Sequence, residues 1–288
     1  SYTGTFDNKN VGTGKTVTIS SSYSGDDTSN YSVTNQSSTT AAIVKKALTA
    51  TASASNKTYN GNTTATTTLS FSGLVGSETL GQSVSSTFNN ENVGTGKTVT
   101  VNSITLSDGS DGGAASNYTI SAGQTTTANI SAKALTVSGI TASNKTYDGN
   151  TNSPLDISNI SYSGLVSGDD IGGSFTGIFD NKNIGTGKTV TISSSYSGTD
   201  SANYSLTDQS STTANITART LTVSGITASD KSYDATTSAT LDVSNISYAG
   251  LVNGDSFSGS YTGVFSSADV GSSKLVTISS SYSGNDLG

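Results

Sequence analysis

The chain reads Gly-Thr-Gly-Lys-Thr-Val-Thr-Ile-Ser at residues 12–20, and the same nine residues recur at 185–193. After the glycines, β-branched apolar residues alternate with hydroxyl residues in both copies. Alternation of this kind predicts a half-buried β-strand. No segment of the chain shows a sustained apolar stripe of helical period, so the sequence predicts an all-β protein.

Self-comparison extends this recurrence to the whole chain. Asn-Tyr pairs begin at Asn30, Asn117 and Asn203, and Lys-(Thr/Ser)-Tyr motifs begin at Lys57, Lys145 and Lys231. The spacings are 87 and 86 residues for the first motif and 88 and 86 for the second, which defines a unit of about 87 residues. The predicted organisation is the C-terminal part of one repeat over 1–46, complete repeats over 47–133 and 134–219, and the N-terminal part of another over 220–288.

Turn signals and boundaries predict how each repeat folds. Short alternating runs at roughly 10-residue spacing indicate an antiparallel, immunoglobulin-like β-sandwich with about seven or eight strands. At the boundaries, apolar residues switch from even to odd positions, for example from Ala214 and Ile216 to Leu221 and Val223. A one-residue shift moves side chains to the other face of a strand. We therefore expect the last strand of one repeat to run directly into the next, which joins the repeats end to end in a stiff rod.

The composition limits the chemistry that the chain can perform. It has no Cys, His, Met or Trp and one Pro, whereas 56 Ser and 48 Thr make up 36% of its 288 residues. Without His or Cys there is no disulfide, no Cys/His zinc site and no Ser-His-Asp triad. We predict that the chain is not an enzyme, and we assign no catalytic, cofactor-binding or metal-ligating residue. The net charge of −7 also argues against nucleic acid as a partner.

Two motifs have a ligand-binding interpretation beside a structural one. Gly-Thr-Gly-Lys-Thr at 185–189 lacks the four-residue spacer and the following helix of a phosphate-binding loop, so we expect a hairpin turn there. The acidic pairs Asp26-Asp27 and Asp169-Asp170 and the run at 108–112 offer the oxygen ligands that Ca²⁺ prefers. We expect these acids to lie in solvated turns, with calcium as the alternative.

Recurring aromatic and lysine residues raise two further alternatives. The aromatic positions are Tyr147, Tyr162, Phe175, Phe179, Tyr196 and Tyr204. Exposed rings would suit a glycan-binding platform, but exchanges such as Tyr2 for Phe175 conserve burial rather than a hydroxyl, so we expect a core role. Lys57, Lys145 and Lys231 lie near recurring Asn residues, which raises the alternative of a Lys–Asn isopeptide crosslink.

The order of the motifs resembles that of a known family. Lys-Thr-Tyr-Asp-Gly at 145–149, Asn-Ile-Gly-Thr-Gly-Lys-Thr-Val at 183–190, Asn203-Tyr204 and Ala-Arg-Thr-Leu-Thr at 218–222 resemble the YDG/MBG-type repeats of large bacterial surface adhesins and filamentous-haemagglutinin-like exoproteins. Two copies depart from the pattern, because Asn60-Gly61 follows Tyr59 and Asp234-Ala235 follows Tyr233. The resemblance implies an extracellular stalk of tandem β-sandwiches and brings no catalytic residues.

These observations predict a structural function. We expect a non-catalytic stalk or filament body of a secreted bacterial adhesin or extracellular fibre, located outside the cell or on its surface and suited to biofilms. Its expected partners are neighbouring repeats of the same chain and, in a fibre, other copies of it; no cofactor and no membrane span are expected. The alternatives are an adhesive module that binds glycan or protein in grooves between repeats, and a self-assembling filament subunit.

Overall fold

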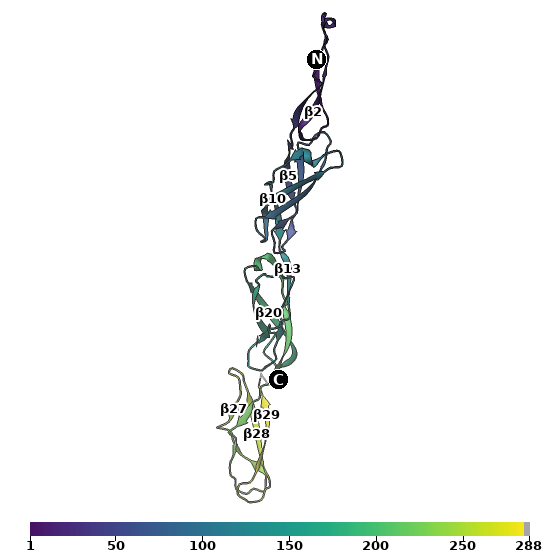
Figure 1. Cartoon of the computed structure of the whole chain (residues 1–288). Helices are drawn as coiled ribbons and strands as arrows, with labels where there is room; N and C mark the ends of the chain where they lie inside the picture. The colour runs from purple at the N-terminus through teal and green to yellow at the C-terminus, as the bar shows by residue number, and fades with distance from the viewer. Residues whose placement is uncertain (285–288) are drawn as a thin grey trace. The chain divides into compact units, whose positions relative to one another are not determined.

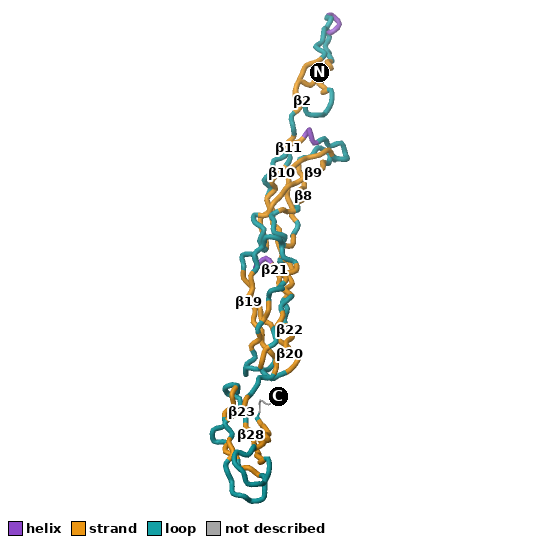
Figure 2. Tube along the Cα trace, turned by 60° about the horizontal axis from the view of Figure 1, so that its bottom comes forward, coloured by secondary structure: helices purple, strands orange, loops and turns teal. Residues whose placement is uncertain are grey.

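The computed structural model describes residues 1–284 and consists almost wholly of β-strands and turns (Figure 1). Within that range the helices are three single turns of 3-10 type, η1 (Thr28–Asn30), η2 (Ala115–Asn117) and η3 (Ser201–Asn203) (Figure 2). None of them has the length or hydrophobicity to cross a membrane. The prediction of an all-β tandem repeat is confirmed.

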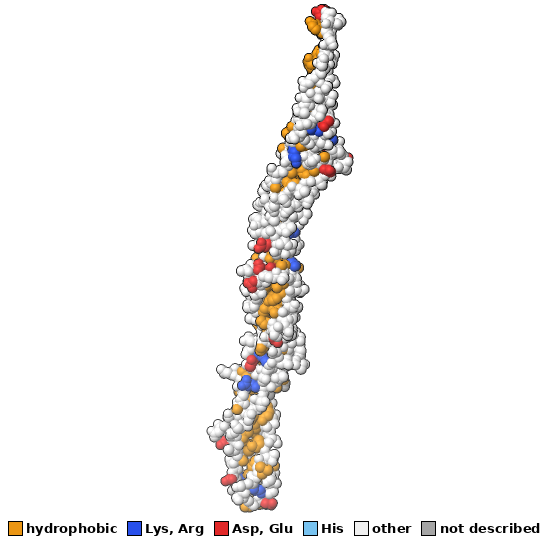
Figure 3. All heavy atoms as spheres, in the orientation of Figure 1, with side chains coloured by type: hydrophobic (Ala, Val, Ile, Leu, Met, Phe, Trp, Pro, Cys, Tyr) orange, Lys and Arg blue, Asp and Glu red, His pale blue; other side chains and the backbone are white. Residues whose placement is uncertain are grey.

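The chain divides into two compact units. Unit 1 comprises Ser1–Lys133 with the loops Val166–Asp169 and Ala202–Ser205, and unit 2 comprises Ala134–Leu165, Asp170–Ser201 and Leu206–Gly288. On the face that Figure 3 shows, charged side chains are scattered among uncharged polar ones, as the Ser- and Thr-rich composition leads one to expect.

Unit 1 holds the strands of the first two repeats. They are β1 (Tyr2–Phe6), β2 (Gly12–Ser21), β3 (Ser38–Ile43), β4 (Lys46–Ala47), β5 (Thr49–Ala54), β6 (Lys57–Thr58), β7 (Thr64–Ala65), β8 (Thr67–Ser72), β9 (Leu80–Phe88), β10 (Gly94–Asp108), β11 (Tyr118–Thr119) and β12 (Thr125–Ser131). The first repeat is the sheet β1-β2-β3, and the main sheet of the second has the order β6-β12-β10-β9-β7. Strands β5 and β8 form a separate antiparallel pair.

Unit 2 holds the strands of the last two repeats. They are β13 (Lys133–Ser138), β14 (Thr141–Ala142), β15 (Lys145–Thr146), β16 (Asn152–Ser153), β17 (Leu155–Asp156), β18 (Ser161–Ser163), β19 (Gly172–Phe179), β20 (Gly185–Ser197), β21 (Tyr204–Thr207), β22 (Ser211–Thr217), β23 (Thr222–Ser224), β24 (Thr227–Ala228), β25 (Ser238–Ala239), β26 (Leu241–Asp242), β27 (Ser247–Ala249), β28 (Ser258–Phe265) and β29 (Val276–Ser283); β13 begins and β21 begins on residues of unit 1. The main sheet, β15-β22-β20-β19-β16, repeats the order found in unit 1.

The second repeat has eight strands, β5–β12, as turn spacing predicts, whereas the third has ten, β13–β22, and many of them are shorter than expected. Many are two-residue segments, such as β16 and β17 on either side of Pro154, which has no N–H to donate to a ladder. The pairing is also not purely antiparallel, because β6 pairs with β12 and β15 pairs with β22 in parallel. These parallel pairs bring the Lys-x-Tyr segment alongside the last strand of its own repeat.

The Gly-Thr-Gly motif is a bulge inside a strand, and the prediction of a hairpin turn was wrong. The pairing register shifts between Gly185 and Lys188, and in the same way between Gly12 and Lys15. Gly187 has a φ of 60°, a left-handed conformation that glycine adopts without a Cβ penalty. Such a bulge adds a residue to one strand of a pair without ending it.

The boundary between the second and third repeats follows the predicted exchange of faces. Only Ala132 separates β12 from β13. Ala128 and Ile130 are buried at even positions, and Leu135 and Val137 are buried at odd positions after the boundary. A strand thus leaves the core of one repeat and enters the core of the next with a one-residue change of phase.

Well-packed cores occur in the two central repeats. In the third repeat one cluster contains Phe179, Val190, Ala214 and Ile216, and a second contains Val137, Ile140 and Ile192. In the terminal segments, by contrast, large side chains remain exposed, including Tyr2 at 71% and Tyr31 at 75% of their surface. Each core is small, which explains how a chain with few large apolar residues can fold.

Candidate functional site at the repeat junctions

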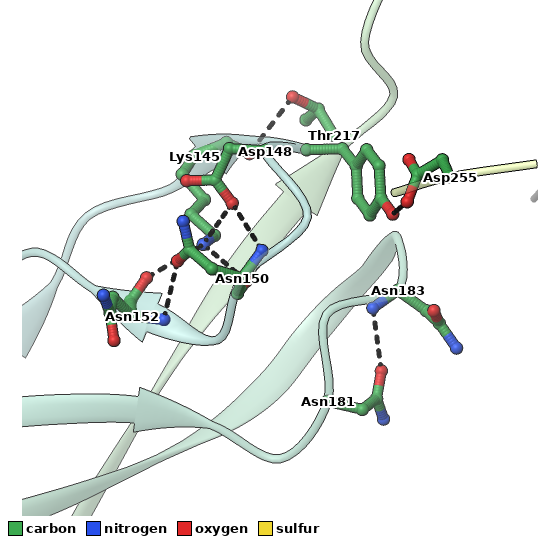
Figure 4. A network of polar contacts seen from close by, with 9 residues as sticks. Lys145, Asp148, Asn150, Asn152, Asn181, Asn183, Thr217 and Asp255 are labelled. Carbon is green, nitrogen blue, oxygen red and sulfur yellow. Dashed lines mark hydrogen bonds and ion pairs between the residues drawn. The ribbon is translucent and has the colours of Figure 1, made fainter. Parts of the chain in front are cut away.

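The Lys-x-Tyr motif folds a loop around an ammonium group. Lys145 Nζ donates to Asp148 Oδ1 at 2.8 Å, to the backbone and side-chain oxygens of Asn150 at 2.8 and 3.1 Å, and to the carbonyl of Asn152 at 2.9 Å (Figure 4). It also lies 5.5 Å from the centre of the Phe179 ring. This arrangement compensates a charge that would be costly to remove from water alone.

The same loop recurs around Lys57 and Lys231, with a different partner in one copy. Lys231 pairs with Asp234, and its hydrogen bond, supported by Thr236, lowers the pKa of that carboxyl to about 2. Lys57 Nζ instead donates to the neutral side chain of Asn60, at 2.8 Å. Burial lowers the pKa of the Lys57 ammonium, and the charge of Glu91 acts in the opposite direction.

In the second and third repeats, the tyrosine of the Lys-x-Tyr motif reaches an acid of the next repeat, whereas Tyr233 in the fourth repeat is 67% exposed. Tyr59 donates to Asp169 at 2.8 Å within unit 1, and Tyr147 donates to Asp255 at 3.1 Å within unit 2. Burial raises the pKa of Tyr147, and the bond to Asp255 raises it further against the opposing effect of Lys182. The motif therefore closes its own loop and joins its repeat to the following one.

At the first two junctions, the Asn-Tyr pair of the following repeat contacts the preceding repeat. The side-chain oxygen of Asn203 accepts the backbone N–H of Val93, from the preceding repeat, at 2.9 Å. Its neighbour Tyr204 donates to Asp169 at 2.6 Å and accepts the N–H of Val166 at 2.9 Å. The rings of Tyr59 and Tyr204 meet edge to face at 5.5 Å. One carboxylate is thus bound by tyrosines of two successive repeats.

The first junction reproduces these contacts with another acid. Asn117 accepts the N–H of Val11 at 2.8 Å, and Tyr118 donates to Glu78 at 2.5 Å. Both side chains occupy the places of Asn203 and Tyr204, one repeat earlier. The contact is therefore a property of the Asn-Tyr motif and not of a single copy.

Glycine permits the close approach at these junctions. A Cβ on Gly61 would lie 2.8 Å from Val166 Cγ1, and a Cβ on Gly149 would lie 2.7 Å from Val252 Cγ1. Both glycines also have left-handed φ angles, of 70° and 78°. In these two copies the glycine is required by backbone conformation and by space.

One position at the junctions carries a positive side chain in two repeats and a negative one in a third: Lys9, Glu91 and Lys182 are equivalent residues. Lys9 pairs with Glu78 at 2.7 Å, and the equivalent Lys182 pairs with Asp255 at 3.3 Å. Glu91 holds this position in the second repeat, at the junction that contains Asp169. The hydrogen bond from Lys9 lowers the pKa of Glu78, with a further contribution from Tyr118.

The acidic residues singled out as calcium candidates act as acceptors in turns and junctions. The Asp169 carboxylate accepts the two tyrosine hydroxyls, whereas Asp170 accepts the backbone N–H of Thr199 at 3.4 Å. Asp108 accepts the N–H of Ala115 at 2.8 Å. Over residues 1–284, no three Asp or Glu side chains gather in a group that could hold a metal ion.

The recurring aromatic residues lie in or against the cores. Phe179 and Tyr204 are buried, and Tyr162, Phe175 and Tyr196 pack against the second cluster of the third repeat. Besides their place in or against the cores, Tyr147 and Tyr204 hydrogen-bond at the junctions through their hydroxyls, which sequence analysis did not predict. These two rings combine burial with a polar contact, as buried tyrosines commonly do.

A groove of about 570 Å³ lies beside the junction of the third and fourth repeats, inside unit 2. Its lining includes Tyr147, Arg219, Asp255, Phe257 and Tyr282. Asn183 and Ile184 also line it, at the positions that correspond to Asn92 and Val93. At the previous junction that place is occupied by Asn203 and Tyr204.

Sequence reasoning used the Asn-Tyr pair and the Lys-x-Tyr tyrosine only as markers of the repeat. Their role could have been inferred from the sequence, because the Asn and Tyr residues of these motifs recur in every copy as regularly as the apolar residues do. A residue needed only for burial tolerates exchange of its polar atoms. A polar atom retained in every copy indicates a specific partner, here in the adjoining repeat.

The chain is thus a tandem-repeat protein. Its repeats share one β-fold, and recurring residues join successive repeats. The profile of the YDG domain matches residues 1–41, 44–128, 131–214 and 217–288, and the chain belongs to this family. The later matches begin at 44, 131 and 217, three residues before the predicted starts at 47, 134 and 220. Neither the curated proteins nor the solved structures include a match to the chain.

Proposed function

We propose that the chain is a non-catalytic structural region of a bacterial surface adhesin or extracellular fibre. In this function it spaces or links adhesive regions outside the cell. The observation that supports the proposal is that recurring polar residues form hydrogen bonds between successive repeats. Tyr59, Tyr147, Asn117, Asn203 and the paired acids join one repeat to the next.

A spacer must resist bending as well as unfolding. The boundary strands leave little free chain between repeats. Ala132 alone lies between β12 and β13, two residues lie between β3 and β4, and residues 218–221 lie between β22 and β23, where the expected direct passage of one strand into the next does not occur. Gly/Ser-rich linkers, which behave as flexible coils, are not present at the described boundaries. Both features support a stiff array, in which each repeat would add about 35–45 Å if strands of about ten residues run along its length.

Small-angle X-ray scattering on chains of two, three and four repeats tests this function. A stiff spacer gives a maximum dimension that increases linearly with repeat number, by about 35–45 Å for each repeat. Growth with roughly the square root of repeat number would contradict the proposal, because freely jointed repeats scale in that way. Mass photometry of the same samples across concentrations separates elongation of one chain from association of several chains.

The groove in unit 2 favours a second candidate, an adhesive module for glycan. Phe257, Tyr282 and Tyr147 contribute aromatic rings, and Arg219 and Asp255 contribute polar groups. Sugar rings stack on aromatic faces while their hydroxyls bond to such polar groups. A glycan array tests this function: binding that is lost in Phe257→Ala supports it, and silence of the intact chain across the array opposes it.

A further inference from the structure

The residue after the motif tyrosine differs chemically among the three copies. It is Asn60 in the second repeat, Asp148 in the third and Asp234 in the fourth. The backbone loop and the lysine partner are the same in each, with a Nζ–Oδ1 distance of 2.8 Å in every copy. The second repeat thus has an amide where the others have a carboxylate bound to the same ammonium group (Figure 4 shows the third repeat).

Asn60 has the features of a reactive amide. It is exposed, and glycine follows it, so no side chain obstructs approach of the next backbone nitrogen to its Cγ atom. Among the described residues, the Gly61 N–H has no hydrogen-bond acceptor. The Oδ1 atom of Asn60 accepts a hydrogen bond from the Lys57 ammonium, the group best placed to stabilise negative charge on that oxygen.

We propose that Asn60 is a self-modification site, at which Lys57 promotes deamidation to a carboxylate that then pairs with Lys57. The Gly61 nitrogen loses its proton to water and bonds to Cγ of Asn60, and negative charge develops on Oδ1 opposite the ammonium. The Cγ–Nδ2 bond then breaks, and the nitrogen leaves as ammonia after taking a proton from water. Water then adds to Cγ of the resulting succinimide, the bond between Cγ and the Gly61 nitrogen breaks as that nitrogen regains a proton, and the side chain of residue 60 becomes a carboxylate; addition of water at the main-chain carbonyl instead gives the isoaspartyl isomer, which has the same mass. No oxidant or reductant takes part.

The fold already contains a site of the kind that a carboxylate at position 60 would form with Lys57. In the third repeat Lys145 and Asp148 form an ion pair at 2.8 Å, and hydrogen bonds from Lys145 and Asn150 hold the pKa of Asp148 below its usual range despite partial burial. A carboxylate at position 60 gains the same charge-assisted contact with Lys57. The conversion therefore replaces a neutral partner of a partly buried ammonium with a charged one.

The hydrogen-bonding of Lys57 favours this reaction over a Lys–Asn crosslink. Its Nζ donates to Asn60 Oδ1 and to the carbonyl oxygens of Asn62 and Thr64. An amine that donates in three directions retains its protons and has no lone pair with which to attack the same Cγ atom. Lys57 acts in the proposal as a positioning residue that stabilises charge, and the nucleophile is the backbone.

The chain contains an internal control. Asn253 is also exposed and is also followed by glycine, Gly254, at which a Cβ would meet nothing within 4 Å. In the described residues no lysine or arginine donates to its side chain. Any reactivity that the Asn-Gly sequence alone confers is shared by Asn60 and Asn253, and the effect of Lys57 is confined to Asn60.

Peptide mapping by mass spectrometry, after incubation of the whole chain in ¹⁸O-labelled water at mildly alkaline pH, tests the proposal. In the folded protein, deamidation of Asn60 should be about tenfold faster than that of Asn253, the factor expected from one charge-assisted hydrogen bond to the transition state. In denaturing urea the two rates should become equal. Equal rates in the folded chain, or a ratio that urea leaves unchanged, would overturn the proposal.

Two variants separate this chemistry from a simple loss of structure. Lys57→Met should slow labelling at Asn60 to the rate of Asn253, whereas Lys57→Arg, which keeps a cation, should retain most of the excess. Asn60→Asp has no amide to lose, so it should take up label at position 60 much more slowly than Asn60 does, and it should melt no lower than the unmodified chain. A Lys57–residue 60 crosslinked peptide formed with loss of ammonia, or an Asn60→Asp chain that melts lower, would contradict the proposal.

Discussion

The second residue after the tyrosine of each Lys-x-Tyr motif has a left-handed backbone conformation, whether that residue is glycine or alanine. The φ angle is 70° at Gly61, 78° at Gly149 and 57° at Ala235. For a residue with a Cβ this conformation costs about 1–2 kcal/mol. The fourth repeat therefore has the same turn as its neighbours but carries local strain.

Replacing Ala235 by Gly should stabilise the fourth repeat by about 1 kcal/mol, since relief of strain exceeds the entropy that glycine adds to the unfolded chain. Urea unfolding followed by circular dichroism measures the change. Gly149→Ala is the matched control and should destabilise, because it adds strain and places a Cβ 2.7 Å from Val252 Cγ1. The same sign for both variants would show that the φ angle does not control stability here.

Introducing a positive charge at position 91 should strengthen the junction that contains Asp169. Glu91→Lys places an ammonium where Lys9 and Lys182 pair with acids in the other copies. We expect a gain below about 1 kcal/mol that declines with added salt, as for other partly exposed ion pairs. Glu91→Gln, which removes the charge without adding a cation, should gain less. Identical unfolding midpoints for the two variants at low salt would contradict an ion pair.

The first junction should weaken in acid. Folding lowers the pKa of Glu78 from its usual 4.5, because Lys9 and Tyr118 donate hydrogen bonds to the carboxylate. A group whose pKa is lowered by folding stabilises the folded state above its unfolded pKa, and this contribution is lost as the pH falls through the folded pKa. Glu78→Gln should therefore lower the melting temperature at neutral pH and have no effect in strong acid. A difference that persists unchanged at low pH would exclude this linkage.

At the scale of the element, most of what sequence predicts concerns strands, and most of what it misses concerns loops. Alternation predicted β2 and β20, and the phase change at Lys133 predicted the passage from β12 to β13, because burial on one face acts on every second residue. The bulge at Gly187 was not predicted, because a glycine pair suits a turn and a bulge equally well. The junction contacts join residues about 110 positions apart, and no local pattern specifies such pairs.

The loop that carries the Asn-Tyr pair should be sensitive to loss of its amide. Asn203 is 3% exposed, so Asn203→Ala leaves the Val93 N–H buried without its acceptor. The expected cost is about 1–3 kcal/mol, measured by urea unfolding. Asn245→Ala, at an exposed residue whose side-chain amide donates to the neighbouring Ser244 hydroxyl, should change stability by less than about 0.5 kcal/mol. Comparable losses in the two variants would argue against the junction contact.

At the scale of the whole molecule, stability should be shared between repeats and their junctions. In tandem arrays the free energy of unfolding is approximately a sum of repeat terms and nearest-neighbour terms. The neighbour term between the second and third repeats includes the two tyrosines on Asp169 and the Asn203 contact. This term exists only when both repeats are present in one chain.

A chain of residues 47–219 should therefore unfold at higher urea concentration than a chain of residues 47–133 alone. Asp169→Asn in the longer chain should remove part of that advantage, because the acceptor of both tyrosine hydroxyls loses its charge. Guanidinium or urea titration of the three proteins measures the difference. If the single repeat is as stable as the pair, the junction contributes no coupling.

The equivalent residues Lys9, Glu91 and Lys182 differ in charge, and this affects how the number of repeats can change by recombination. Recombination that adds or deletes one repeat retains the tyrosine and asparagine of the junction contacts, but it can exchange the lysine that pairs with an acid of the next repeat, as Lys9 and Lys182 do, for a residue like Glu91. Recombination by two repeats preserves the lysine–acid pairs. The near identity of residues 1–25 and 174–198, which differ at three positions, fits duplication in pairs. The number of repeats can thus change in steps of two without any new kind of junction contact.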